Sequence, residues 1–243
     1  YEYITSATRA DEVCKKLLEN KSVSFDTETT GTDPHKDKVS LLSVASRKDG
    51  AFVAETNDPR ILEAFSPLLS NENIIKIAHN GGFDYKMAKG TTGVETENIL
   101  CTMLGEYCLT AGLQFNGYGL DDVTQKYLNK TRDKSLQKSF IGHVGAFSKA
   151  QLDYSAEDSI ELLDIADKMK EKMKEQGLIK TWLLESSALQ SFADMEYYGQ
   201  RIDKDLWQRS ISQNYAIAKQ AKDQLDEFFR PVCGMRFSLD PLS

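Results

Sequence analysis

Several features that commonly identify a protein class are missing from this sequence. The four cysteines of the 243-residue chain are scattered without a Cys-x-x-Cys pair, which argues against structural zinc and against a disulfide scaffold. The three histidines show no metal-ligand spacing, and we interpret them as turn or surface residues. No apolar stretch is long enough to span a membrane, and no signal peptide pattern is present. We therefore expect a reducing compartment and no membrane partner.

The chain also lacks an initiator methionine. It begins with Tyr1, so we expect the natural start to lie upstream or to have been removed. A cytoplasmic location is the default expectation, and an organelle stays open because a transit peptide would be lost from the same end. The length suits one α/β domain with a full core and a helical appendage. We expect a monomer.

What the sequence does contain is acidic residues in three short motifs. The first lies in KSVSFDTETTG, where alternating Val23 and Phe25 and the β-branched content favour a strand. Because strand side chains repeat every two residues, Asp26 and Glu28 project from the same face. Buried carboxylates need partners, which makes such a pair unusual in a core strand. A solvated strand end is the alternative interpretation.

The second motif is IIKIAHNGGFDYKMAK, residues 74–89. Its isoleucines predict a core strand, the letters HNGG predict a turn, and helical spacing begins near Phe83. Asp84 then lies in the first helical turn, where the helix dipole favours a carboxylate, so it has a structural as well as a functional interpretation. Asn80 is similarly open between a turn or cap residue and a hydrogen-bonding residue of a site.

The third motif lies in a long amphipathic helix predicted over residues 149–175. Tyr154 and Asp158 are four residues apart, so they share one face and can converge on one point. A surface tyrosine and aspartate on a charged helix are the alternative. We interpret the other acids of this helix as a solvated face.

Together the motifs supply four carboxylates and a phenol from segments far apart in the sequence. Two carboxylates about 6 Å apart repel by roughly 3 kcal/mol at an effective dielectric near 20. Four that converge therefore need bound cations or protonation. Hard oxygen ligands favour magnesium or manganese over zinc, and two such ions suit the in-line cleavage of a phosphodiester.

The remaining patterns place strands early in the chain and helices later, which indicates an α/β fold with a mixed β-sheet flanked by helices. Strands are predicted over residues 22–28, 38–46, 51–55 and 74–78. Helices are predicted over residues 9–20, 59–69, 83–90, 120–129, 149–175, 180–198 and 204–229.

The phrases FDTETTG, HNGGFDY and YSAED, in this order, resemble the 3′–5′ exonucleases of the DEDD superfamily. A tyrosine four residues before the last aspartate is similar to the DEDDy branch, as is the phrase DKSLQKSF. The resemblance covers roughly residues 20–170 and implies a ribonuclease H-like fold. It also implies a metal-dependent nuclease that removes nucleoside monophosphates from a 3′ end and whose catalytic residues are Asp26, Glu28, Asp84, Tyr154 and Asp158.

The same resemblance implies a role for each residue. Asp26, Glu28 and Asp158 hold the first of two Mg²⁺ or Mn²⁺ ions. Asp26 bridges to the second ion, which Asp84 supports, and Tyr154 orients the attacking water because a phenol of pKa about 10 is a poor base. Further candidates for substrate contact are Thr27, Asn80, Lys134 and Gln137.

The segment LLESSALQSFADMEYYGQRIDKDLW resembles the junction between the proofreading domain and the thumb of family A DNA polymerases. It implies an exonuclease domain over 1–176 and a helical, thumb-like start over 177–243. Gly199 would end one helix and Asp203 would cap the next. The implied partners are the single-stranded 3′ end of DNA and a polymerase domain of the same full-length chain. No palm or fingers follow in the sequence.

Two other functions stay open. The motifs also resemble RNA 3′–5′ exonucleases of the ribonuclease D type, so RNA is a possible substrate, although the GQRID segment favours the polymerase type. A catalytically inactive nucleic-acid-binding scaffold is the third possibility. Relatives that lost activity have generally lost carboxylates, and here all four are present.

Positive charge is scarce, since the formal net charge is −7, whereas nucleic-acid binding usually rests on Lys and Arg. Residues 126–149 are an exception, with one acid, Asp133, and six basic residues: Lys126, Lys130, Arg132, Lys134, Lys138 and Lys149. Our hypothesis is that this stretch flanks the path of a single strand, and a solvated basic loop is the alternative.

One position departs from the family. Relatives commonly carry a leucine or methionine after the T-G of the first motif, where it packs against the terminal base, and this chain has Thr32. Phe140 or Phe147 could supply the apolar contact instead. Aromatic residues within 107–118 could also stack on bases, with core packing as the alternative.

Overall fold

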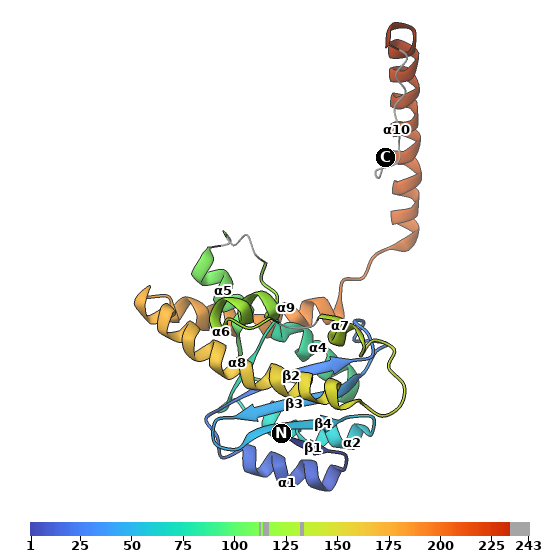
Figure 1. Ribbon diagram of the computed structural model, residues 1–243. Helices are drawn as coiled ribbons and strands as arrows, with labels where there is room; N and C mark the ends of the chain where they lie inside the picture. The colour runs from blue at the N-terminus through green and yellow to red at the C-terminus, as the bar shows by residue number, and fades with distance from the viewer. Residues whose placement is uncertain (112, 114–116, 132–133, 234–243) are drawn as a thin grey trace. The chain divides into compact units, whose positions relative to one another are not determined.

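The computed structural model describes residues 1–111, 113, 117–131 and 134–233, with only the backbone for residues 134, 135, 232 and 233. Within these residues a six-stranded mixed sheet has the order β1-β4-β3-β2-β5-β6 (Figure 1). Its strands are β1 Glu2–Ile4, β2 Ser22–Thr29, β3 Val39–Ser46, β4 Gly50–Glu55, β5 Ile75–Ala78 and β6 Ile99–Cys101. β3 pairs antiparallel with both β2 and β4, whereas β2, β5 and β6 are parallel to one another.

The same described residues also form the helices of the chain. They are α1 Ala7–Leu17, α2 Pro59–Ala64, α3 Ser66–Leu69, α4 Gly81–Thr92, α5 Thr102–Thr110, α6 Leu120–Leu128, α7 Lys134–Lys138, α8 Lys149–Glu175, α9 Ile179–Tyr198 and α10 Lys204–Cys233. The predicted mixed sheet flanked by helices is confirmed. One predicted helix, over residues 59–69, is in fact two short helices, and the shared residue Phe65 caps both.

The two edge strands β1 and β6 and the short helix α7 were not predicted. Each strand has only three residues, too few to show an alternating pattern, and each pairs with a single neighbour in the sheet. A segment this short becomes a strand because its neighbour offers hydrogen bonds, which periodicity in the sequence does not report.

The central strand β2 divides its side chains between two cores, as its period of two requires. Val23 and Phe25 are fully buried in the core that α1 and α4 cover. Ser24 points to the opposite face, where its hydroxyl donates to the carbonyl of Ser159 in α8 at 2.5 Å. The Ser24 side chain therefore bonds β2 directly to α8, and Figure 1 shows this helix crossing the sheet.

Helix α8 begins where the sequence predicts, at a capping box. The Ser148 hydroxyl accepts from the amide of Gln151, and the Gln151 side chain in turn accepts from the amide of Ser148. The helix buries an apolar stripe that includes Leu162, Ile165 and Met169 against the sheet and α6. The cap and the stripe together fix both the start and the rotation of the helix that carries the third motif.

The compact unit that contains the sheet extends from Tyr1 to Tyr198, past the predicted boundary at residue 176. Helix α9 belongs to this unit because it packs on α4, α5 and β6. Trp182 is buried there, and its Nε1 donates to the carbonyl of Cys101 at 2.7 Å.

The second unit comprises Gly199–Ser243, and its described part contains helix α10. Gly199 has a φ of +64°, as a residue that ends a helix commonly does. The Asp203 carboxylate accepts from the amide of Leu206 at 2.9 Å, which confirms the predicted cap. None of the helices in the described part of the chain combines the length and apolar character that crossing a bilayer requires.

A close approach inside α4 allows a test of this packing. A Cβ built on Gly90 would lie 1.9 Å from the carbonyl oxygen of Pro34, whereas one on Gly82, in the same helix, would meet nothing closer than 3.8 Å. We expect Gly90→Ala to lower the free energy of unfolding by about 1–3 kcal/mol through steric overlap. Gly82→Ala should be neutral or slightly stabilising, since alanine favours helices. Urea unfolding measures both, and equal stability of the two variants would contradict the packing.

Candidate active site

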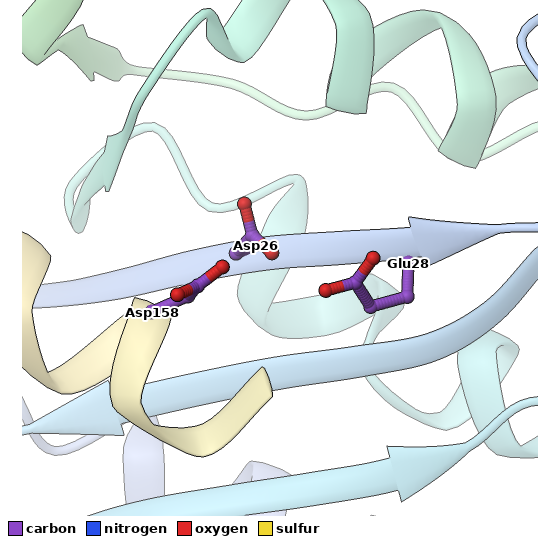
Figure 2. Close-up of side chains that lie close together, drawn as sticks. All are labelled: Asp26, Glu28 and Asp158. Carbon is purple, nitrogen blue, oxygen red and sulfur yellow. The ribbon is translucent and has the colours of Figure 1, made fainter. Parts of the chain in front are cut away.

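Three acidic side chains meet where β2 passes under α8. Asp26 and Glu28 come from alternate positions of β2, and Asp158 comes from α8 (Figure 2). One carboxylate oxygen from each lies within 4.8 Å of the other two. Glu28 and Asp158 are 7% and 4% exposed, and Asp26 is half-buried. The structure therefore brings two of the three motifs together at one point.

Their mutual repulsion makes this arrangement costly without a positive charge. Ionised carboxylates at that separation repel by about 3–4 kcal/mol per pair at an effective dielectric of 20. The donor set consists only of carboxylate oxygens, which suits a hard divalent cation such as Mg²⁺ or Mn²⁺. These three residues fit a metal site by number, spacing and chemistry.

Asp84 approaches from the first turn of α4. Its Oδ1 accepts two hydrogen bonds from Thr27, one from the backbone amide at 3.0 Å and one from the hydroxyl at 2.6 Å. Strand β5 pairs with β2 only as far as Ser24, so the amide of Thr27 is available for this bond. Thr27 thereby ties the second motif to the first.

Burial changes the acidity of this carboxyl. Asp84 is 3% exposed, and its desolvation raises the pKa to about 6, although the hydrogen bonds from Thr27 act in the opposite direction. At neutral pH the burial of the ionised Asp84 carboxylate therefore costs free energy, and a cation in the same pocket would lower that cost.

All five predicted catalytic residues line one pocket of about 320 Å³. Three of the four predicted substrate-contact residues, Thr27, Asn80 and Gln137, line it as well. The side chain of the fourth, Lys134 at the start of α7, lies outside the described residues. The direct contact of Thr27 is with Asp84, so in this structure it positions a carboxylate.

Asn80 and Gln137 differ in how they reach the pocket. Asn80 is the N-cap of α4 in a left-handed conformation with a φ of 55°, but its side chain makes no capping hydrogen bond. The cap interpretation is therefore wrong for the side chain, which lines the pocket instead. Gln137 is an exposed residue of the short helix α7.

Tyr154 is supported from behind by aromatic packing. It is 9% exposed, and its ring lies 6.2 Å, centroid to centroid, from that of Phe140. Phe140 is fully buried and also packs on Phe147. The expectation that Phe140 contacts a terminal base is wrong, because the hydrophobic core around Tyr154 takes up its whole surface.

Half of the charges in the basic stretch are paired with the protein's own carboxylates. Lys126 forms an ion pair with the buried Glu106. Lys130 pairs with Glu161 at 2.9 Å, and Lys149 pairs with Asp153 at 2.5 Å. Three of the six charges thus have acidic partners, while Arg132 lies outside the described residues. The charge count alone overstated the positive potential of this stretch.

The interpretation of His79 as a turn or surface residue is wrong, because the residue is buried at the pocket wall. His79 is 9% exposed and lines the pocket. Its Nε2 donates to the carbonyl of Tyr118 at 2.8 Å, and its Nδ1 lies 2.9 Å from the Thr102 hydroxyl. His79 therefore fastens the segment before α6, whose first residues line the pocket, to β5. The signal was its place at the end of a core strand, directly before Asn80.

Tyr107 and Tyr118 also fall in the region proposed for base stacking. Their rings stack on each other with centroids 3.8 Å apart, but Tyr107 is 42% exposed and does not lie in the core. Phe115 lies outside the described residues.

Comparison with known proteins agrees with the pocket. A family model described as 3′–5′ exonuclease matches residues 1–174. The chain belongs to the 3′–5′ exonuclease family. Its relatives include both DNA polymerase I and ribonuclease D proteins, which supports the assignment to the DEDDy type of this family.

One relative of each of these two kinds serves as an example. The DNA polymerase I of Aquifex aeolicus is 24% identical over 261 residues, which cover 100% of this chain and 42% of that protein. The ribonuclease D of Sphingobium indicum is 25% identical over 211 residues, which cover 85% of this chain and 51% of that protein. This chain thus spans about half, or less than half, of the length of these relatives.

Solved structures show the same fold. Escherichia coli RNase D superposes with a TM-score of 0.68 at 20% identity. The superposition covers 79% of this chain and 50% of the RNase D chain. The catalytic core of RRP6 from Trypanosoma brucei superposes with a TM-score of 0.70 at 16% identity and covers 78% and 51%. The predicted ribonuclease H-like fold is therefore confirmed.

The buried charge of Asp84 gives a pH-dependent prediction. A raised pKa means that the folded state binds the proton more tightly, so this group's contribution to stability falls as pH rises from about 4 to about 6. In EDTA at pH 7.5, we expect Asp84→Asn to stabilise the fold by on the order of 1 kcal/mol, a few degrees in Tm, because asparagine still accepts from Thr27 without a charge. This advantage should shrink at pH 4.

Thermal unfolding in EDTA measures this effect, and Asp11→Asn, on the exposed surface of α1, controls for the general loss of one negative charge. Added Mg²⁺ should raise the Tm of the unmodified protein more than that of Asp84→Asn. If Asp84→Asn were no more stable than the unmodified protein at pH 7.5, the buried charge of Asp84 would not destabilise the fold.

The contact between Thr27 and Asp84 gives a second prediction. Thr27→Val removes the 2.6 Å hydroxyl bond but keeps the backbone bond and the branched shape. We expect about a tenfold loss of nuclease kcat with a small change in Tm, since the lost bond is worth about 1–2 kcal/mol. Thr27→Ser keeps the hydroxyl and should cleave at close to the original rate. Equal rates for the two variants would rule out this role.

Proposed function

We propose that this chain is a metal-dependent 3′–5′ exonuclease that removes nucleoside monophosphates from the 3′ end of DNA as the proofreading domain of a DNA polymerase. The observation that carries the nuclease assignment is the cluster of Asp26, Glu28 and Asp158, with Asp84 in the same pocket.

The extent of one match supports the polymerase context. The alignment with the DNA polymerase I of Aquifex aeolicus covers the whole chain, α10 included, whereas that with the DNA polymerase I of Rhizobium leguminosarum covers 84% of it and those with three ribonuclease D proteins cover 85%, 80% and 72%. The part beyond the exonuclease unit therefore has a counterpart in the Aquifex aeolicus polymerase. Attachment to a polymerase domain is part of the proposal.

An RNA exonuclease of the ribonuclease D type is the second candidate. It is favoured by the ribonuclease D proteins among the relatives and by the superposition with Escherichia coli RNase D. The two candidates share the same carboxylates, so they differ in substrate and not in chemistry. The 2′-hydroxyl of the substrate is the group by which they would differ.

The proposed mechanism divides the work among the pocket residues. Two divalent cations would stabilise the charge that develops on the attacking and leaving oxygens of an in-line displacement. Asp26, Glu28 and Asp158 would hold one ion, and Asp84, held by Thr27, would support the other together with Asp26. Tyr154 would orient the attacking water through its hydroxyl, with its ring held by the packing of Phe140.

This division predicts unequal losses. Asp26→Ala should lose nearly all activity, at least about a thousandfold, because it removes a ligand to the cations. Tyr154→Phe should keep measurable activity, with a loss of about tenfold to a hundredfold, because an orienting hydrogen bond contributes less. Single-turnover cleavage in Mg²⁺ measures both. Equal losses in the two variants would contradict the assigned roles.

The substrate is tested with 5′-labelled single-stranded DNA and RNA of matched sequence in Mg²⁺, Mn²⁺ or EDTA. The proposal predicts a metal-dependent ladder that shortens from the 3′ end of DNA and is absent with Asp26→Ala. Faster cleavage of RNA than of DNA would favour the ribonuclease D type. No cleavage of either strand in the presence of metal would contradict the proposal.

A further inference from the structure

A second concavity adjoins the catalytic pocket. It lies between α4, α5 and α9 and has a volume of about 380 Å³, similar to that of the catalytic pocket. We call it the α9 groove and define it by Phe83, Met103, Leu104, Leu189 and Phe192. Phe83 and Met103 line both the groove and the catalytic pocket, so the two spaces share a wall.

The groove exposes apolar surface to solvent. Phe192 lines it with 61% of its surface accessible to solvent, while Leu189, one turn before it, is 9% exposed. Exposed aromatic surface costs free energy in water and gains from contact with a flat apolar ligand. Phe83, directly before the catalytic Asp84, places a second aromatic ring at the end nearest the carboxylates.

The charges around the pocket favour this side for the substrate. Another concavity, between α7 and α8, adjoins the pocket through Tyr154 and Asp158. Among the described residues it is lined by further acids, Glu157 and Glu161 among them, and by Lys130, which already pairs with Glu161. These carboxylates would repel a phosphodiester chain. The described lining of the α9 groove carries fewer acids, Glu185 and Glu196, and Glu196 is paired with Lys86.

We propose that the α9 groove is the binding site for the base of the penultimate nucleotide of the substrate strand. The inference rests on the proposed nuclease function, because that function places the scissile phosphate at the carboxylates. The terminal nucleotide occupies the catalytic pocket. The next base lies on the other side of the wall formed by Phe83 and Met103, where it stacks against Phe192. A base has an apolar face whatever the sugar, so the site serves DNA and RNA alike.

The groove also accounts for the departure at Thr32. Thr32 is exposed and polar, and it offers no apolar contact of the kind that the resemblance associates with that position. An aromatic platform built from α4 and α9 holds the strand end from a different side. The grip on the 3′ end then depends on the base next to the terminal one.

The test removes one base from the substrate and one side chain from the protein, separately and together. The substrates are a single-stranded oligonucleotide and the same oligonucleotide with an abasic residue at the penultimate position. Each is measured with the unmodified chain, with Phe192→Ala and with the control Met195→Ala, which removes an equally exposed apolar residue of α9 outside the groove. The readouts are kcat/KM in Mg²⁺ and the Kd from fluorescence anisotropy in EDTA.

We expect the abasic substrate to lose about tenfold in kcat/KM and in affinity with the unmodified chain, as the loss of one stacked base does. Phe192→Ala should show that loss on the intact substrate and little further loss on the abasic one. Met195→Ala should behave as the unmodified chain on both. Circular dichroism checks that each variant is folded.

Several results would overturn the groove assignment. An equal loss with Phe192→Ala on both substrates, or no loss on either, would show that Phe192 does not contact the penultimate base. If the unmodified chain showed no loss on the substrate that is abasic at the penultimate position, the register would be wrong. Failure of the nuclease proposal is distinguishable, because it appears as no cleavage by the unmodified chain, and the anisotropy comparison then still decides whether the groove binds the base.

Discussion

Mutual repulsion among carboxylates is the constraint on which the rest of this structure depends. Three acidic side chains with oxygens within 4.8 Å of one another need a scaffold that resists their separation. β2 supplies two of them from the middle of the sheet, and α8 supplies the third. Helix α8 is attached to β2 by the bond from Ser24 to Ser159 and by the apolar packing of its buried face. The rigid crossing of strand and helix thus maintains a charge cluster that is ready for cations.

The fourth carboxylate shows how the two faces of the sheet cooperate. Asp84 belongs to the helix on the opposite side of β2, yet Thr27 draws it to the strand through two hydrogen bonds. The strand alternates, so Asp26 and Glu28 face α8 while Thr27 faces α4. The strand thus presents two carboxylates on one side and holds a third from the other. The early end of the pairing between β5 and β2 matters for the same reason, because it leaves the Thr27 amide available.

Much of the site could be predicted from the sequence because its motifs are local. Alternation predicts the shared face of Asp26 and Glu28, and helical spacing predicts that of Tyr154 and Asp158. Contacts that join distant segments were not accessible in this way. The bond from Thr27 to Asp84 depends on where β5 ends, and the place of His79 depends on a carbonyl 39 residues later. The pairing of Lys130 with Glu161 likewise exists only in the folded chain.

The most direct test of the central claim is a crystal structure of the chain soaked in Mn²⁺ with anomalous diffraction. The account predicts two manganese peaks in the pocket, one coordinated by Asp26, Glu28 and Asp158 and the other by Asp26 with Asp84, directly or through water. Loss of the peaks in crystals of Asp26→Ala would assign them to these ligands. An absence of manganese between β2 and α8 at millimolar concentration, or a peak that touches none of these carboxylates, would contradict it.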